Sequence, residues 1–101
     1  MVSIALNDNV LHIKPEGELS IYQVESILLQ LVPLVSKANV CVVNLSSIDK
    51  IDTAGFQLLV SLRKGFEMMQ KPFEITGIAN STHNFMQLFG FDWDTQMKGE
   101  E

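Results

Sequence analysis

Apolar residues that alternate with polar ones, or follow one another without interruption, predict four strands in this chain. Residues 2–6 and 10–14 flank the turn-forming sequence Asn7-Asp8-Asn9, which is typical of a β-hairpin. Residues 40–45 are mostly apolar and β-branched, as expected of a strand that is buried on both faces. Residues 72–78 have the composition of a fourth strand.

Three further segments have the spacing of helices. The first begins at Ser20, which can form a capping box with Gln23, and we expect it to end within residues 31–36, where a proline interrupts the pattern. The second covers residues 54–70. The third covers residues 81–89 and is ended by a glycine.

The order ββαβαβα predicts an α/β fold. We expect a mixed, mainly parallel four-stranded sheet with an N-terminal hairpin and helices packed on it, on one face only because the chain is short. At 101 residues the chain has the length of a single domain, residues 1–101. We expect residues 95–101, which are polar and acidic, to be a disordered tail.

The start of the second helix contains two apolar residues that do not fit its buried stripe. Six residues have the spacing of a face turned towards the sheet: Gly55, Leu58, Leu59, Leu62, Phe66 and Met69. Phe56 and Val60 lie off this stripe, one turn apart, and we expect them to be exposed. The alternative is that Phe56 is covered by a neighbouring loop.

Composition and charge favour a cytoplasmic protein with a protein partner. The formal net charge is -5 and Lys and Arg do not cluster, which argues against binding to nucleic acid or to an anionic membrane surface. No apolar run approaches the roughly 20 residues that cross a bilayer, and the N-terminus lacks the pattern of a signal peptide. A single cysteine, Cys41, cannot form an internal disulfide.

The residues give little indication of catalysis, a cofactor or a metal site. Cys41 lies in the most apolar strand, where a thiol is a small hydrophobe rather than a nucleophile. Asp49 and Asp52 could act as an acid/base pair or bind a cation, but capping and solvation are the expected roles of two carboxylates without further ligands. His12 falls on the polar side of its strand. A small enzyme or ligand carrier that uses the Asp49 and Asp52 loop is the competing hypothesis.

Several of these segments together resemble the STAS domain, a family named for sulphate transporters and anti-sigma-factor antagonists. The resemblance rests on residues 17–19 (Gly-Glu-Leu), 43–48 (Val-Asn-Leu-Ser-Ser-Ile), 51–56 (Ile-Asp-Thr-Ala-Gly-Phe) and 88–91 (Leu-Phe-Gly-Phe), in this order. It implies a small bacterial regulator of signalling or transcription that acts in the cytoplasm by protein–protein interaction.

One departure from the family pattern lies at the regulatory position. In the anti-sigma-factor antagonists, a partner kinase phosphorylates the second Ser of an Asp-Ser-Ser-Gly motif at the start of the second helix. By position, Asp52 matches the Asp, Thr53 the first Ser, Ala54 the phosphorylated Ser and Gly55 the Gly. Because alanine has no hydroxyl group, the family's switch cannot operate at Ala54.

Two interpretations follow from the resemblance. In the first, Thr53 accepts the phosphate and the partner is a serine-kinase-type anti-sigma factor. In the second, the chain is an unphosphorylated adaptor that resembles the small STAS subunit of bacterial lipid-trafficking ABC transporters, and the partner is the ATPase subunit. Both predict a monomer or weak homodimer and one partner-binding surface, formed by Asp49, Lys50, Asp52, Thr53, Ala54, Gly55, Phe56 and Val60.

Overall fold

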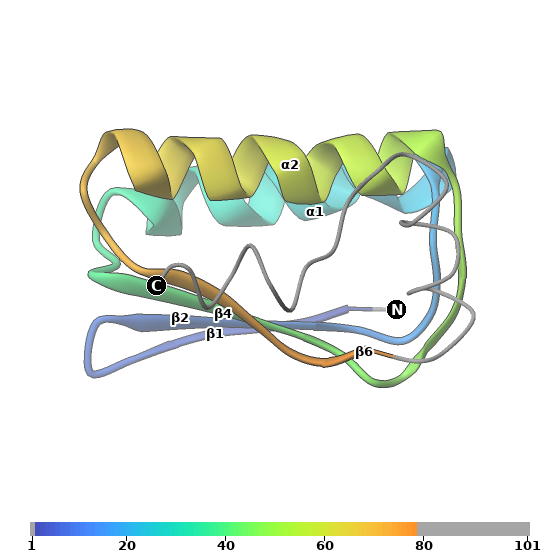
Figure 1. The fold of residues 1–101 in the computed structure, drawn as a ribbon, viewed down its shortest axis with the longest axis horizontal. Helices are drawn as coiled ribbons and strands as arrows, with labels where there is room; N and C mark the ends of the chain where they lie inside the picture. The colour runs from blue at the N-terminus through green and yellow to red at the C-terminus, as the bar shows by residue number, and fades with distance from the viewer. Residues whose placement is uncertain (1, 79–101) are drawn as a thin grey trace.

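Two helices cover one face of a four-stranded sheet in the computed structural model, which describes residues 2–78 (Figure 1). The sheet has the order β1-β2-β4-β6 and consists of β1 (Val2–Asn7), β2 (Val10–Pro15), β4 (Val40–Leu45) and β6 (Phe73–Ile78). The β1–β2 hairpin is antiparallel and the other two pairings are parallel, which confirms the predicted architecture. The helix predicted at residues 81–89 and the tail at 95–101 lie outside the described residues.

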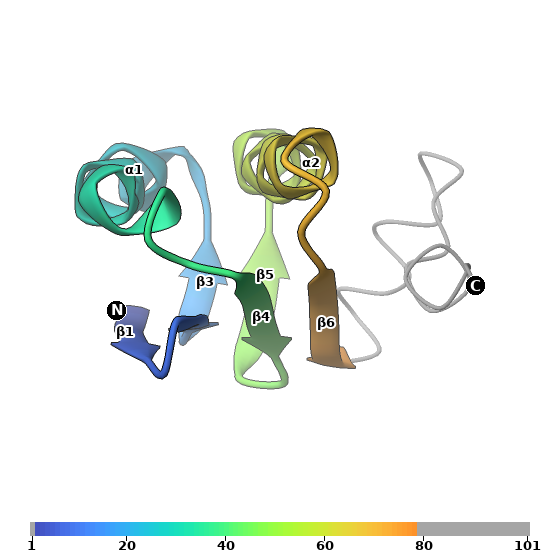
Figure 2. The same cartoon turned by 90° about the vertical axis from the view of Figure 1, so that its left-hand side faces the viewer.

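A second sheet of two short strands was not predicted. β3 (Gly17–Leu19) pairs in parallel with β5 (Ile48–Ile51), where the sequence indicated only a break and a loop. Three- and four-residue segments are too short for a recognisable alternation of polar and apolar residues. Each strand leads directly into a helix, so their pairing holds the first turns of the two helices side by side (Figure 2).

The helix α1 (Ile21–Val35) begins and ends where the sequence predicted. The Ser20 side chain accepts a hydrogen bond from the backbone of α1, and the Gln23 side chain accepts one from the Ser20 backbone N–H at 3.0 Å. These two bonds form the predicted capping box. Pro33 lies in the last turn, and Ser36 is the C-cap residue.

The helix α2 (Thr53–Met68) differs from the prediction at three positions. Val60, expected to be exposed, is partly buried and packs against the core. Phe56, expected to be exposed, is only 4% exposed and belongs to the core. Met69, expected to be buried, follows the helix as its C-cap residue and is partly exposed. The burial of Phe56 comes from tertiary packing, because α2 contacts α1, β3, β5 and β6.

The core lies between the helix layer and the sheet. Its most deeply buried large side chains come from both layers: Leu11, Leu19, Ile27, Leu31, Val43, Leu45, Ile48, Leu59 and Phe66. Within residues 2–78, neither helix is both long enough and apolar enough to span a bilayer. The inward side chains of β4 thus pack against both helices, and the carboxyl end of this strand leads into the segment that carries the candidate site.

Candidate functional site

The Asp52 carboxylate connects the first turns of the two helices. One of its oxygens, Oδ1, accepts a hydrogen bond from the Gly55 N–H at 2.9 Å and caps α2. The other, Oδ2, accepts a hydrogen bond from the Ile21 N–H at 3.0 Å, at the start of α1. Bonds to the Gly55 and Ile21 backbone stabilise the anion and lower the pKa of Asp52, so the carboxyl group is ionised near neutral pH.

Gly55 allows two backbone segments of this chain to approach closely. A Cβ atom placed on Gly55 would overlap the carbonyl oxygen of Leu19 and would lie 2.8 Å from the Leu19 carbonyl carbon. The Asp52 N–H also donates a hydrogen bond to this carbonyl oxygen, at 3.2 Å. Glycine at this position therefore permits the close approach of the β3 backbone to the start of α2. Gly55 is buried and is not available to a partner.

The exposed part of the predicted partner surface is smaller and more polar than the sequence indicated. Thr53, the first residue of α2, is exposed, as are Asp49 and Lys50 on β5. Asp52, Ala54 and Val60 are partly buried. Because Phe56 is in the core, it cannot supply the apolar contact that we assigned to it.

The geometry leaves the two candidate reactive groups with structural roles. Each oxygen of Asp52 accepts a hydrogen bond from a backbone N–H group, so this carboxylate is a cap, and its lowered pKa makes it a weak base. Cys41 is fully buried, and burial raises the pKa of its thiol to about 12, which keeps it protonated and unreactive. Within residues 2–78, no three His, Cys, Asp or Glu side chains come together as metal ligands.

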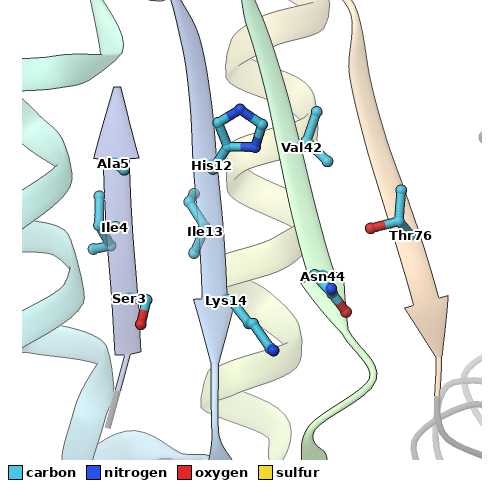
Figure 3. A pocket seen from close by; sticks show the side chains of 9 residues that line it. All are labelled: Ser3, Ile4, Ala5, His12, Ile13, Lys14, Val42, Asn44 and Thr76. Atoms are coloured by element: carbon cyan, nitrogen blue, oxygen red, sulfur yellow. The ribbon is translucent and has the colours of Figure 1, made fainter. Parts of the chain in front are cut away.

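The open face of the sheet has a shallow hollow of about 280 Å³ (Figure 3). Side chains on it form two rows across the strands, with Ser3, Lys14, Asn44 and Thr76 in one row and Ala5, His12 and Val42 in the other. His12 is exposed, as its position in the alternation predicted. Polar side chains spread across several strands are typical of the solvated face of a one-sided sheet.

The structure brings two residues to the site that the sequence did not indicate. Ile21 and Tyr22, in the first turn of α1, lie beside Asp52 because of the hydrogen bond from the Ile21 N–H. Tyr22 is 85% exposed and Ile21 is also exposed. The sequence does contain an indication of these exposed residues, because Ile21 and Tyr22 are large and apolar but lie outside the buried stripe of α1. Their proximity to Asp52 depends on a contact across 31 positions, which no local pattern shows.

Comparisons with known proteins agree with this fold. Residues 2–96 match a family model described as "Mlab, STAS domain". A comparison with curated proteins found no match. Among solved structures, the anti-sigma factor antagonist SpoIIAA in its unphosphorylated form is similar with a TM-score of 0.77 and 15% identity, over 89% of this chain and 81% of that one.

Two other solved structures widen the range of similar proteins. An anti-sigma factor antagonist from Mycobacterium paratuberculosis has a TM-score of 0.74 and 16% identity, over 89% of this chain and 77% of that one. A sulfate transporter family protein from Wolinella succinogenes has a TM-score of 0.73 and 14% identity, over 95% of this chain and 77% of that one. At these identities the likeness shows the fold, whereas the family model covers nearly the whole sequence. The chain therefore belongs to the STAS domain family.

Proposed function

We propose that this STAS domain is a non-enzymatic regulatory protein that binds a protein partner through the surface around the start of α2. We call this surface the helix-head surface and define it by Asp49, Lys50, Asp52, Thr53 and Ala54. The exposure of Thr53, at the first position of α2 and next to an ionised carboxylate, is the observation that carries the proposal. The similarity to anti-sigma factor antagonists, which act on another protein, supports it.

The rigidity of the helix-head surface suits it to protein recognition. Asp52 ties the first turns of both helices together, and the β3–β5 pair fixes the segments that precede them. A surface that is already ordered loses little conformational entropy when a partner binds, so more of the contact energy contributes to affinity.

The capping geometry favours an adaptor that works without phosphorylation. A phosphate is stabilised at the start of a helix when backbone N–H groups are free to bind it. Here the Gly55 N–H is already bound to Asp52, and this carboxylate is itself anionic. Ala54 offers no hydroxyl group at all. We therefore propose the adaptor role first, as the STAS subunit of a lipid-trafficking ABC transporter that binds the ATPase in the cytoplasm.

Phosphorylation of Thr53 is the second candidate, and the exposure of this residue supports it. A kinase could reach its hydroxyl group, and a phosphate would add about -1.5 to -2 charge beside Asp49 and Asp52. The helix-head surface would then become strongly acidic and would release any partner with an acidic or apolar contact surface. The partner in this case is a serine-kinase-type anti-sigma factor.

Three substitutions at one position test both candidates. The partner is first purified from the native cells with the wild-type domain as bait, and its dissociation constant is then measured by calorimetry. Thr53→Arg places a long cation at the centre of the helix-head surface and should raise the dissociation constant at least tenfold, with an unchanged circular dichroism spectrum. Ser3→Arg, on the open face of the sheet, is the matched control. Normal binding by Thr53→Arg would overturn the proposal.

Thr53→Val and Thr53→Glu separate the two candidates. Thr53→Val removes the hydroxyl group and keeps the size of the side chain, so an adaptor should retain both its affinity and its activity in cells. If Thr53 is a switch, Thr53→Glu should release the partner, and mass spectrometry should find phosphothreonine at this position in protein from native cells. Recovery of an ABC ATPase or of a kinase-type anti-sigma factor identifies the pathway.

A further inference from the structure

The outer side of α1 exposes more apolar surface than a helix at a protein surface normally does. Five large apolar residues of this helix are exposed: Ile21, Tyr22, Leu28, Leu29 and Val32. We call them the α1 patch. Tyr22 is 85% exposed and Leu29 and Val32 are each 71% exposed. Tyr22 and Leu29 are seven residues apart and therefore lie on the same side of the helix.

The composition of α1 shows that the patch is not an ordinary amphipathic face. The helix buries Ile27 and Leu31 against the core, yet its exposed side carries large apolar residues beside the polar Ser26 and Gln30. Glu25 is the one charged residue between Ile21 and Val35. Exposed apolar residues that gather on one side of a helix mark interaction sites. The sequence of α1 is therefore that of a helix with a second contact.

The α1 patch is continuous with the helix-head surface. The hydrogen bond of 3.0 Å from the Ile21 N–H to Asp52 places the first residue of the patch against the cap of α2. The two helices begin at the same end of the molecule and run side by side (Figures 1 and 2). A partner seated over Thr53 and Asp52 can therefore extend onto α1, where Ile21 and Tyr22 are exposed.

We propose that the partner-binding surface continues from the helix-head surface onto α1, and that Tyr22 and Leu29 are its apolar anchors. This inference rests on the proposed function and names the part of the surface that supplies most of the binding energy. Protein interfaces concentrate their affinity in a few desolvated aromatic and apolar residues. Phe56 cannot fill this role because it is buried, and Tyr22 is the exposed aromatic residue beside the same site.

The charges around the patch specify the chemistry of the partner. Four acidic residues lie around it: Glu18 on β3, Glu25 on α1, Asp49 on β5 and Asp52 at the α2 cap. Two bases lie near them, Lys50 on β5 and the exposed Lys37 just after α1. For the adaptor candidate, the complementary surface is therefore apolar at its centre and carries Lys or Arg at its rim. A second copy of this chain would bring the same acidic groups against one another, and an anionic membrane would be repelled by them.

Photo-crosslinking in native cells tests the location of the surface. The photoreactive residue p-benzoylphenylalanine replaces Tyr22, Leu29 or Thr53 in turn, and replaces Met68 as the control, because Met68 is equally exposed and apolar but lies at the far end of α2. We expect one and the same partner from positions 22, 29 and 53 and none from position 68. The crosslinked peptide of the partner should be apolar and flanked by Lys or Arg.

The outcomes separate the inference from the proposed function. Crosslinks from position 53 but not from 22 or 29 would overturn the inference alone, and no crosslink from any of the three would overturn both. Crosslinks from 22 and 29 to a second copy of this chain, or to lipid, would also overturn the inference.

Affinity measurements with the purified partner give the magnitude. Tyr22→Ser and Leu29→Ser should each raise the dissociation constant at least tenfold, while Met68→Ser should leave it unchanged. Thermal unfolding should be the same for all three variants because all three side chains are exposed. Wild-type affinity in Tyr22→Ser and Leu29→Ser would contradict the anchor role.

Discussion

Gly55 of α2 lies against the carbonyl group of Leu19 in β3 so closely that no side chain fits between them. This contact joins the short second sheet to the second helix. It explains why a glycine follows the cap of α2 at the third position, although glycine is a poor helix former. The contact also fixes the position of the first turn of α2 relative to the first turn of α1. The reason is that Leu19 directly precedes Ser20, the N-cap residue of α1.

Adding one methyl group at Gly55 should destabilise the protein. In Gly55→Ala the Cβ atom would overlap backbone atoms of Leu19, which cannot move aside as a flexible side chain does. We expect a loss of about 1–3 kcal/mol in the free energy of unfolding, measured by urea denaturation. Gly65→Ala is the matched control in the same helix, because nothing lies within 4 Å of its Cβ position. It should stabilise the protein by about 0.5–1 kcal/mol.

Replacing the capping carboxylate should weaken the protein and change its response to acid. Asp52→Ala removes the acceptor of the Gly55 and Ile21 N–H groups, and we expect a loss of about 0.5–2 kcal/mol, as for other N-cap residues. Because these bonds lower the pKa of Asp52 in the folded protein, its contribution is present above the pKa of the unfolded chain. That contribution disappears as the pH falls through the lowered pKa.

Urea denaturation at a series of acidic pH values tests this dependence. The difference in stability between wild type and Asp52→Ala should shrink as the pH falls below the ordinary range of a carboxyl group. Asp49→Ala, which removes an exposed carboxylate from the neighbouring strand and no helix cap, is the matched control. A constant difference at all pH values would show that Asp52 acts by something other than its charge.

Substitution of Phe56 should impair folding, because this residue is buried. Its predicted place on the partner-binding surface would instead have meant a loss of binding in a folded protein. Phe56→Asp should lose the circular dichroism signal of the folded domain, because it would place a charge in the core. Phe56→Ala should lower the free energy of unfolding by about 3–5 kcal/mol. Tyr22→Ala, which truncates an exposed aromatic side chain, should change it by less than about 0.5 kcal/mol. A folded Phe56→Asp variant would contradict the position of this ring.

The thiol of Cys41 should react only when the protein unfolds. Burial raises its pKa to about 12 and leaves no exposed surface on this residue. We expect an aromatic disulfide reagent at neutral pH to modify the native protein very slowly and the urea-unfolded chain at once. The Gly55→Ala variant unfolds more often, so its thiol should be modified faster than that of the wild type under native conditions. The ratio of the two rates should equal the ratio of the two unfolding equilibrium constants. Rapid modification under native conditions would contradict the burial of the thiol.

Residue patterns were sufficient for the main sheet and for the starts of both helices. The apolar run at residues 40–45 became the strand β4, although the prediction that both its faces are buried was wrong, since only Cys41, Val43 and Leu45 are fully buried. The capping box of Ser20 and Gln23 begins α1 as predicted. These features are local, because a strand is recognised from alternation or a continuous apolar run, and a cap from residues three positions apart. The family resemblance also depended on such short motifs, and the family model confirms it.

The composition of the candidate site was decided by contacts between distant segments. Asp52 could be recognised as a cap, but its bond to Ile21 depends on the β3–β5 pairing, which sets residues 31 positions apart side by side. The folded protein likewise buries Phe56 in the core and leaves Tyr22 exposed next to Ile21. Helical periodicity says which side of a helix is apolar, and only the packing of other elements determines which apolar residues are covered.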